Sequence, residues 1–225
     1  MFQGFSQQTL DFLWNIRFNN EKSWFEAHRE EFKAVLAQPM NALASDVFAA
    51  FAGKFPDLGL SLHVSRIYRD ARRLHGQGPY KDHLWFTLYH GDEECADSPV
   101  FWFEIGPEIW SYGLGYYLAK PLTMAKHRAR IDSDPRPLLA LTDELAGQTE
   151  FALEGDSYAR PKGDPGERLF AWYNKKSFAL IHEERSGKAL FTPELTARIT
   201  DGFTFLVPCY RYFGTLGGDP APRER

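Results

Sequence analysis

The sequence predicts an α+β protein, with N-terminal helices packed on an antiparallel meander sheet, followed by further helices and a small second β segment. Apolar residues recur at helical spacing through the first quarter of the chain, and from residue 60 to residue 119 they recur at every second position instead. Separate runs of helices and strands are typical of α+β proteins. With 225 residues, of which 44% are hydrophobic, the chain is long enough to bury a core without a structural metal or disulfide.

Residues 6–55 are predicted to form three helices, because their apolar residues form three successive stripes. The stripes consist of Leu10, Leu13 and Trp14, then Phe25, His28, Phe32, Val35 and Leu36, then Leu43, Val47, Phe51 and Phe55. Asn19 and Asn20 precede an acidic residue, a pattern that predicts an N-cap for the second helix. Pro39 predicts a separation between the second and third helices, because proline lacks the N–H that continues a helix.

Four strands are predicted next, each bounded by Gly, Pro or acidic turn residues. They cover residues 60–69, 84–90, 100–105 and 111–118. In the third strand, the alternation predicts that Phe101, Phe103 and Ile105 are buried against the N-terminal helices. Trp102 and Glu104 then fall on the opposite face of the sheet, where we expect the Glu104 carboxylate to face solvent.

The remainder of the chain mixes helices with short strands. Helices are predicted at residues 121–131, 135–146 and 192–204, and strands at residues 151–154 and 177–183. Residues 160–166 are rich in Pro and Gly and are typical of a loop. The chain has no internal repeat and no long linker, so the sequence favours one α+β domain over residues 1–216 and a C-terminal tail over residues 217–225.

Composition and charge narrow the classes of function. A net charge of −4 argues against a protein that coats nucleic acid, because such binding depends on neutralising phosphates, and nucleic acid is therefore not a favoured partner. No apolar run approaches the roughly 18–20 residues of a membrane span, so we expect no membrane partner. The N-terminus lacks the features of a secretory signal, and we therefore expect a cytoplasmic protein. The sequence does not predict the oligomeric state.

Metal and cofactor binding have little support in the sequence. Cys95 and Cys209 lie far apart, and the seven histidines show no ligand spacing, so we expect no metal and no cofactor. His75 and His83 lie beside the basic residues 66–73 and 78–81. The acidic stretch 92–97 lacks the alternating oxygen ligands of a calcium loop, and we expect it to be a solvated hairpin tip.

Positive charge gathers in residues 66–73 and continues at Gly-Pro-Tyr-Lys, residues 78–81. Several guanidinium groups aimed at one small volume match the geometry of a phosphate or carboxylate. On a regular strand, Arg66 and Asp70 share a face that excludes Arg69, but a bulge near Arg69 would bring the three together. Alternatively, Asp70 accepts hydrogen bonds from neighbouring arginines and only ties the strand end to the loop.

The chain resembles a known family through motifs spread over nearly its whole length. The motifs are Phe5, Thr9-Leu10, Asn19-Asn20, Trp24-Phe25, Arg66-x-x-Arg69-Asp70-x-Arg72, Pro79-Tyr80-Lys81, Gly113-x-Gly115 and Pro161-Lys162-Gly163. In this order they are similar to the bacterial family catalogued as domain of unknown function 2461. Two positions depart from the family pattern: Arg73 stands in place of Phe, and Gly76-Gln77 in place of an acidic-basic pair. The resemblance implies a candidate site at the first arginine motif and marks a second basic loop, but it implies no activity.

The function that the sequence favours is binding of a phosphate- or carboxylate-bearing ligand at an arginine-rich site. The expected ligand-binding residues are Arg66, Arg69, Arg72 and Lys81, with Asp70 and Tyr80 orienting them, and Arg160 and Lys162 in the second basic loop. One alternative is an enzyme acting on a phosphorylated substrate, with Asp70 or Glu104 as the general base. Another is a local nucleic-acid groove in which Trp85, Tyr89 or Trp102 stacks on bases.

Overall fold

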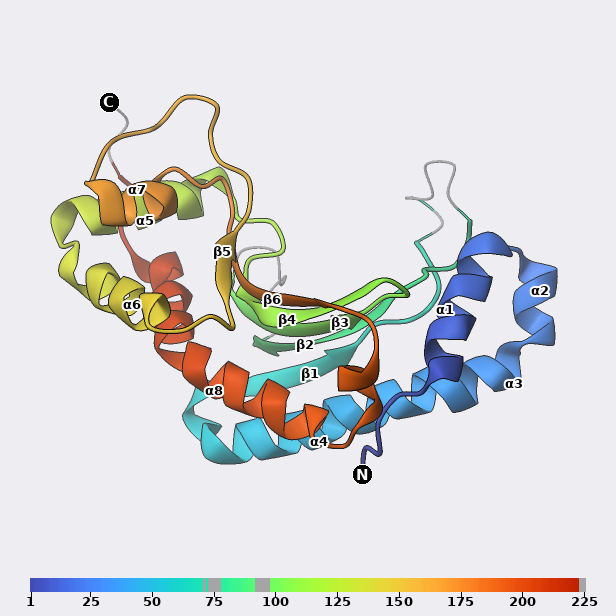
Figure 1. Ribbon diagram of the computed structural model, residues 1–225. Helices are drawn as coiled ribbons and strands as arrows, with labels where there is room; N and C mark the ends of the chain where they lie inside the picture. Colours follow the sequence, from blue (N-terminus) through green and yellow to red (C-terminus); the bar gives the residue numbers. More distant parts are fainter. Residues whose placement is uncertain (71, 73–77, 92–97, 223–225) are drawn as a thin grey trace. The chain divides into compact units, whose positions relative to one another are not determined.

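The structure is a computed structural model that describes residues 1–70, 72, 78–91 and 98–222. These residues include an open, antiparallel sheet of six strands in the order β1-β2-β3-β4-β6-β5 (Figure 1). The strands are β1 Leu60–Val64, β2 Leu84–His90, β3 Val100–Ile105, β4 Ile109–Gly115, β5 Ala152–Glu154 and β6 Ala179–Arg185. Neighbouring strands are consecutive from β1 to β4, which confirms the predicted meander and the α+β class.

The helices flank the meander in sequence. The first group is α1 Gln7–Phe18, α2 Lys22–Ala27, α3 Arg29–Phe32, the π-helix η1 Lys33–Ala37, and α4 Gln38–Lys54. The second group is α5 Pro121–Ser133, α6 Arg136–Ala146, α7 Glu167–Tyr173 and α8 Leu195–Gly214. Helix α7 has 7 residues, too few for a helical period to show in the sequence. Among the described residues, no helix is both long enough and apolar enough to cross a membrane.

The chain forms two compact units. The first comprises Met1–Leu88, Trp102–Tyr112 and Glu183–Asp201, and the second comprises Tyr89–Phe101, Gly113–His182 and Gly202–Arg225. One domain over residues 1–216 stays a prediction.

In the first unit, the sheet has one buried and one half-exposed face. Leu84, Phe86 and Leu88 of β2 are buried, while the residues between them are half-buried. In β3, the Phe103 ring stacks on Phe86 at 5.5 Å between ring centroids. Helix α4 runs along β1 (Figure 1) and buries one apolar stripe. The predicted alternation is therefore confirmed, and the opposite, half-exposed face is available for function.

The helix containing Pro39 does not stop where the sequence predicts. The π-helix η1 leads directly into α4, with Pro39 in the first turn of α4. A proline lacks the N–H that would bond the carbonyl four residues earlier, which here belongs to Val35. The Thr9 hydroxyl of α1 donates to this Val35 carbonyl at 2.6 Å. The helix continues through Pro39 because the Thr9 hydroxyl of α1 supplies the donor that Pro39 lacks. The predicted break is therefore wrong.

In the second unit, residues 202–214 of the C-terminal helix α8 pack on β3. The Phe101 ring of β3 lies 5.0 Å from Phe203 and 4.9 Å from Tyr210, both on α8. The sequence predicts that Phe101 packs on the N-terminal helices, but a helix distant in sequence covers it. Helix α8 also extends ten residues beyond its predicted end at residue 204, because apolar residues on both sides of Pro208 are buried.

Two further contacts shape the second unit. Gly115 of β4 approaches the neighbouring chain segment so closely that a Cβ there would lie 2.6 Å from the Phe178 carbonyl oxygen. In the C-terminal segment, Asp219 accepts a hydrogen bond from Arg130 Nε of α5 at 2.7 Å. The first residues of the expected tail are therefore anchored to the unit.

Candidate anion-binding site

The basic segment forms an irregular hairpin in the first unit. Strand β1 ends at Val64, so the prediction of a strand through Arg69 is wrong. Pairing continues in a different register through an isolated antiparallel bridge between Tyr68 and Tyr80. The Arg69 amide donates to the Pro79 carbonyl at 2.8 Å. The segment thus stays attached to its partner without continuing the ladder.

The change of register comes from two extra residues on the returning segment. The Ser65 amide bonds the Trp85 carbonyl, and the Lys81 amide bonds the Ile67 carbonyl, both at 2.8 Å. One residue separates Ser65 from Ile67, but three separate Lys81 from Trp85. The two extra residues of the returning segment form a bulge around Asp82 and His83. Bulges are over-represented beside active sites. The bulge considered from the sequence lies near Arg69 instead, on the opposite segment.

Asn20 fixes the returning segment to the turn between α1 and α2. Its side-chain oxygen accepts the Tyr80 amide, and its side-chain nitrogen donates to the Tyr80 carbonyl, both at 2.9 Å. The side chain packs so closely on Gly78 that a Cβ there would lie 2.3 Å from it. The predicted N-cap role is wrong: Glu21 occupies the N-cap position of α2, without a side-chain capping bond.

Tyr80 positions Arg69 through its main chain. Its ring is buried and stacks on Phe25, with 4.3 Å between ring centroids. Burial raises the pKa of the Tyr80 hydroxyl, and the nearby Tyr68 and Glu26 raise it further. The Tyr80 carbonyl accepts a hydrogen bond from Arg69 Nε at 2.8 Å.

Lys81 lies within electrostatic range of two arginines. Its ammonium group donates to the Arg66 main-chain carbonyl at 2.6 Å and lies 4.2 Å from the centre of the Trp85 ring. Burial is the main cause that lowers the Lys81 pKa, and the positive charges of Arg69 and Arg66 lower it further. We call these three residues, Arg66, Arg69 and Lys81, the cation cluster.

Arg72 instead pairs with Asp70. Its Nε and Nη2 atoms contact the two Asp70 carboxylate oxygens at 3.0 and 2.9 Å, and the side chain is 87% exposed. Of the predicted site residues in this segment, the structure thus groups Arg66, Arg69 and Lys81, and joins Asp70 to Arg72. Residue 73, His75 and residues 76–77 lie outside the described residues.

A group of ionisable side chains adjoins the cation cluster at the bulge. Asp82 accepts hydrogen bonds from Arg17 Nε at 2.5 Å and from His83 Nδ1 at 3.0 Å, and lies 3.8 Å from Arg69 Nη2. Burial alone would raise the Asp82 pKa, but the hydrogen bonds from His83 and Arg17 outweigh it and lower the pKa. Sequence reasoning missed Arg17 and Asp82, because nothing in the sequence links residues 65 positions apart.

Glu104 belongs to the same group. It is half-buried on the less covered face of the sheet, so the expectation that it faces solvent is only partly met. Burial raises its pKa, Asp82 raises it further, and His83 opposes the shift. Trp85 is half-buried, and its ring stacks on His83 with 5.5 Å between ring centroids. The half-buried Trp102 precedes Glu104 by two residues, and Tyr89 belongs to the second unit.

The second basic loop lies in the second unit. The Lys162 ammonium is 4.8 Å from the centre of the Tyr158 ring, and Arg160 is exposed. Buried Asn174 fixes the loop by accepting the Lys162 amide at 2.6 Å and donating to the Gly163 carbonyl at 3.1 Å. The Pro-Lys-Gly motif therefore has a structural role here. A part in ligand binding stays a prediction.

The remaining candidates concern metals and thiols. Within the described ranges, no group of three or more His, Cys, Asp or Glu side chains is placed to hold a metal ion. The acidic stretch 92–97, with Cys95, lies outside these ranges. Cys209 is buried in α8, and burial raises the pKa of its thiol to about 12.

Comparison with known protein families gives a match that covers most of the chain. Residues 8–212 match the family described as conserved hypothetical protein, DUF2461. This range includes both arginine-containing segments and every residue of the cation cluster. No curated protein matches the chain. Because the match spans nearly all of the chain, the protein belongs to the DUF2461 family.

Proposed function

We propose that the cation cluster binds the phosphate or carboxylate group of a small ligand. The observation that carries this proposal is the placement of the Lys81 ammonium group, which lies 2.6 Å from the Arg66 carbonyl oxygen, while Arg69 is held on the carbonyl of the preceding residue, Tyr80. Burial lowers the pKa of Lys81, and the positive charges of Arg69 and Arg66 lower it further. Within the described part of the chain, neither Arg66 nor Lys81 forms an ion pair. A bound anion would supply a nearby negative charge and would favour the charged form of Lys81.

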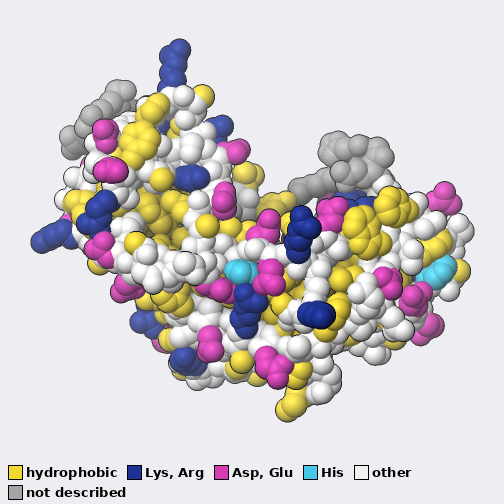
Figure 2. All heavy atoms as spheres, viewed as in Figure 1, with side chains coloured by type: hydrophobic (Ala, Val, Ile, Leu, Met, Phe, Trp, Pro, Cys, Tyr) yellow, Lys and Arg dark blue, Asp and Glu magenta, His cyan; other side chains and the backbone are white. Residues whose placement is uncertain are grey.

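The surroundings favour a small ligand over a long polyanion. Asp82 lies 3.8 Å from Arg69, so an acidic group borders the cluster. Arg17, which also contacts Asp82, has a second acidic partner in Glu108 at 3.3 Å. Figure 2 shows Lys and Arg side chains interspersed with Asp and Glu on the visible face. Nucleic-acid binding depends on many phosphate contacts and is strongly salt-dependent.

Thermal unfolding in phosphate tests the proposal. If phosphate binds with a dissociation constant of about 1 mM, about 100 mM phosphate should stabilise the native protein by about 2.7 kcal/mol through mass action. For a chain of this length the melting temperature should rise by about 5–10 °C over a chloride control of equal ionic strength. Removing one positive charge with Lys81→Gln should abolish most of this rise.

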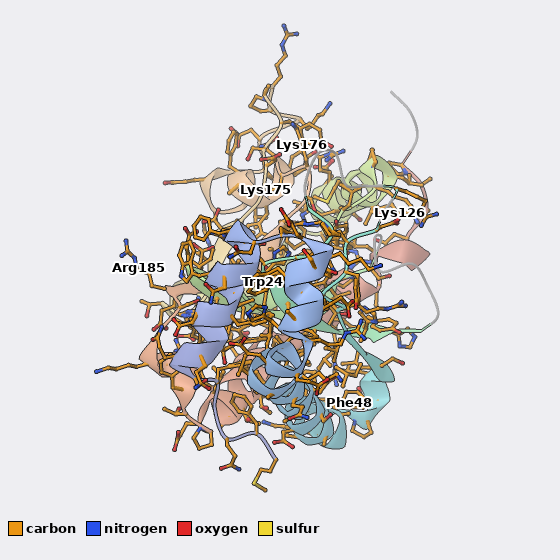
Figure 3. The ribbon with its side chains drawn as sticks, turned by 90° about the vertical axis from the view of Figure 1, so that its right-hand side faces the viewer. Trp24, Phe48, Lys126, Lys175, Lys176 and Arg185 are labelled. Atoms are coloured by element: carbon orange, nitrogen blue, oxygen red, sulfur yellow. The ribbon has the colours of Figure 1, made fainter. Side chains whose placement is uncertain are left out.

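Lys175→Gln provides a matched control. Lys175, labelled in Figure 3, also donates its ammonium group to a main-chain carbonyl, that of Gly155, at 2.6 Å. It belongs to the second unit, so this variant should keep the phosphate effect. Equal loss in both variants, or no phosphate effect in the wild type, would reject the proposal. If the protein instead binds long polyanions more tightly than phosphate, and added salt abolishes this preference, the result would indicate nucleic-acid binding.

A second candidate is acid-base catalysis on a phosphorylated substrate, with Glu104 as the general base. The pKa of Asp82 is lowered and that of Glu104 is raised, and His83 interacts with both. Environments that separate two carboxyl pKa values in this way are used by enzymes to assign acid and base roles. Asp70 fits less well, because it is bound to exposed Arg72.

Phosphate release from p-nitrophenyl phosphate tests this candidate. A general base must be ionised, so activity should rise with pH through the raised pKa of Glu104. Glu104→Gln should remove the activity while leaving phosphate binding at the cation cluster intact. No release above that of a buffer blank, or full activity in Glu104→Gln, would contradict a catalytic role for Glu104.

A further inference from the structure

A pocket of about 310 Å³ lies in the first unit, beside the basic hairpin. Its volume is near the lower end of the roughly 300–1,000 Å³ of small-molecule sites. The lining includes the apolar residues Phe32, Met40, Val64, Ile67 and Leu84. One side of the pocket is formed by the helices before β1, and the other by β1 and the hairpin.

The polar groups of the lining are largely used within the protein. The Ser65 hydroxyl accepts the Trp85 amide at 3.0 Å, and the Asn41 side chain donates to the Ala37 carbonyl at 2.7 Å. These hydrogen bonds leave the walls predominantly apolar. Such walls favour an apolar group in the pocket over a polar one, since burying an unpaired polar group costs free energy.

The helical wall is irregular at the pocket. Ala37, the last residue of η1, contributes to the lining, and its small side chain leaves space there. Single-turn π-helices are rare and are frequently found at functional sites. Here the irregular turn is retained by the Thr9 hydroxyl, which satisfies the Val35 carbonyl from a different helix.

Arg66 connects this pocket to the cation cluster. It lines the pocket, and its main-chain carbonyl accepts a hydrogen bond from the Lys81 ammonium group at 2.6 Å. We propose that the ligand is an amphipathic carboxylate. Its short apolar chain fills this pocket while its carboxylate binds the cation cluster, so this inference rests on the proposed anion site. The pocket thereby selects the apolar body of the ligand and the cluster selects its charge.

Affinity for carboxylates of increasing chain length tests this inference. Titration calorimetry at constant ionic strength would compare acetate, butyrate, hexanoate and octanoate, with hexanol as an uncharged probe. Each buried methylene should tighten binding by about fourfold until the pocket is full. Hexanol should bind more weakly than hexanoate, because it lacks the charge that the cluster recognises.

Two substitutions fill the pocket without removing a positive charge. Ala37→Phe should reduce the affinity for octanoate to that for acetate, and Val64→Phe provides a second variant should the first not fold. Ala34→Phe is the matched control, because Ala34 lies exposed on the same π-helix and outside the lining. This control should bind octanoate as the wild type does.

The outcomes separate the two proposals. If acetate and phosphate bind and Lys81→Gln abolishes their binding, but octanoate binds no tighter than acetate, the pocket inference is overturned and the anion site stands. Equal weakening of octanoate binding by Ala37→Phe and Ala34→Phe overturns the inference in the same way. If neither acetate nor phosphate binds, the anion site itself is rejected, and this inference is rejected with it.

Discussion

His127 of α5 is fully buried in the second unit, and its environment opposes a charge on the imidazole. Burial is the main cause that lowers its pKa to about 4; the nearby Trp172 carbonyl opposes the shift, and the positive charges of Arg128 and Arg130 add to it. The ordinary value is 6.5. Between these values the native state therefore binds fewer protons than the unfolded state.

We predict that His127 makes the native protein lose stability as the pH falls from about 6.5 to about 4. A pKa difference of this size corresponds to about 3 kcal/mol between the two limits. His127→Phe should remove this part of the pH dependence, measured by urea unfolding at several pH values. His63→Gln, at an exposed position on β1, should keep it. Identical pH profiles for wild type and His127→Phe would contradict this account.

Residue roles that depend on local sequence are predictable, and roles that depend on distant contacts are not. The basic motif by itself singles out Arg66, Arg69 and Lys81 as candidates, and their part in anion binding stays a prediction. It does not identify Arg17, which reaches Asp82 from another element. Asn20 stands out in the sequence but suggests the wrong role, because an asparagine before a helix is usually a cap. A side chain that binds the main chain 60 residues away leaves no local signal.

At the scale of elements, Asn20 should determine how firmly the hairpin is held. Asn20→Ala removes two hydrogen bonds to the Tyr80 main chain and is expected to destabilise the protein by about 1–3 kcal/mol. Phosphate affinity should fall as well, because Tyr80 positions Arg69. Asn19→Ala is the control, since the Asn19 side chain bonds the nearby Asn15 carbonyl and, within the described residues, makes no hydrogen bond to the hairpin. Denaturant unfolding that ranks Asn19→Ala as the more damaging change would refute this role.

The π-helix gives a second prediction at this scale. Thr9→Val leaves the Val35 carbonyl without its donor and also removes the acceptor for the Ser6 amide, so it should cost about 1–3 kcal/mol. Pro39→Ala restores an N–H four residues after Val35. It should therefore be less destabilising, or even stabilising, when combined with Thr9→Val than when made alone.

A double-mutant cycle in chemical denaturation measures this coupling. Thr9→Ser, which keeps the hydroxyl, should show no such coupling to Pro39→Ala. Additive free-energy changes for Thr9→Val and Pro39→Ala would mean that the Thr9 hydroxyl does not substitute for the missing proline donor.

At the scale of the whole molecule, the sequence predicts the fold class and the regular strands well. The bounds of β2 and β3 agree with the prediction, because an alternating pattern is set by local burial on one face. The end of β1 could not be predicted, because the two extra residues that shift its register lie on its partner. Helix α8 is longer than the sequence predicts, because Tyr210, beyond Pro208, stacks on Phe101 of β3, which is distant in sequence.

The central claim is that Arg66, Arg69 and Lys81 form an anion site, and the Lys81 pKa tests it most directly. NMR titration of isotopically methylated lysines, with Lys81→Gln for assignment, would follow the Lys81 ammonium group with and without phosphate. We predict a pKa below the ordinary value of 10.5 that rises when phosphate is added, and no phosphate-induced change at Lys175. An ordinary Lys81 pKa that phosphate leaves unchanged would contradict the claim.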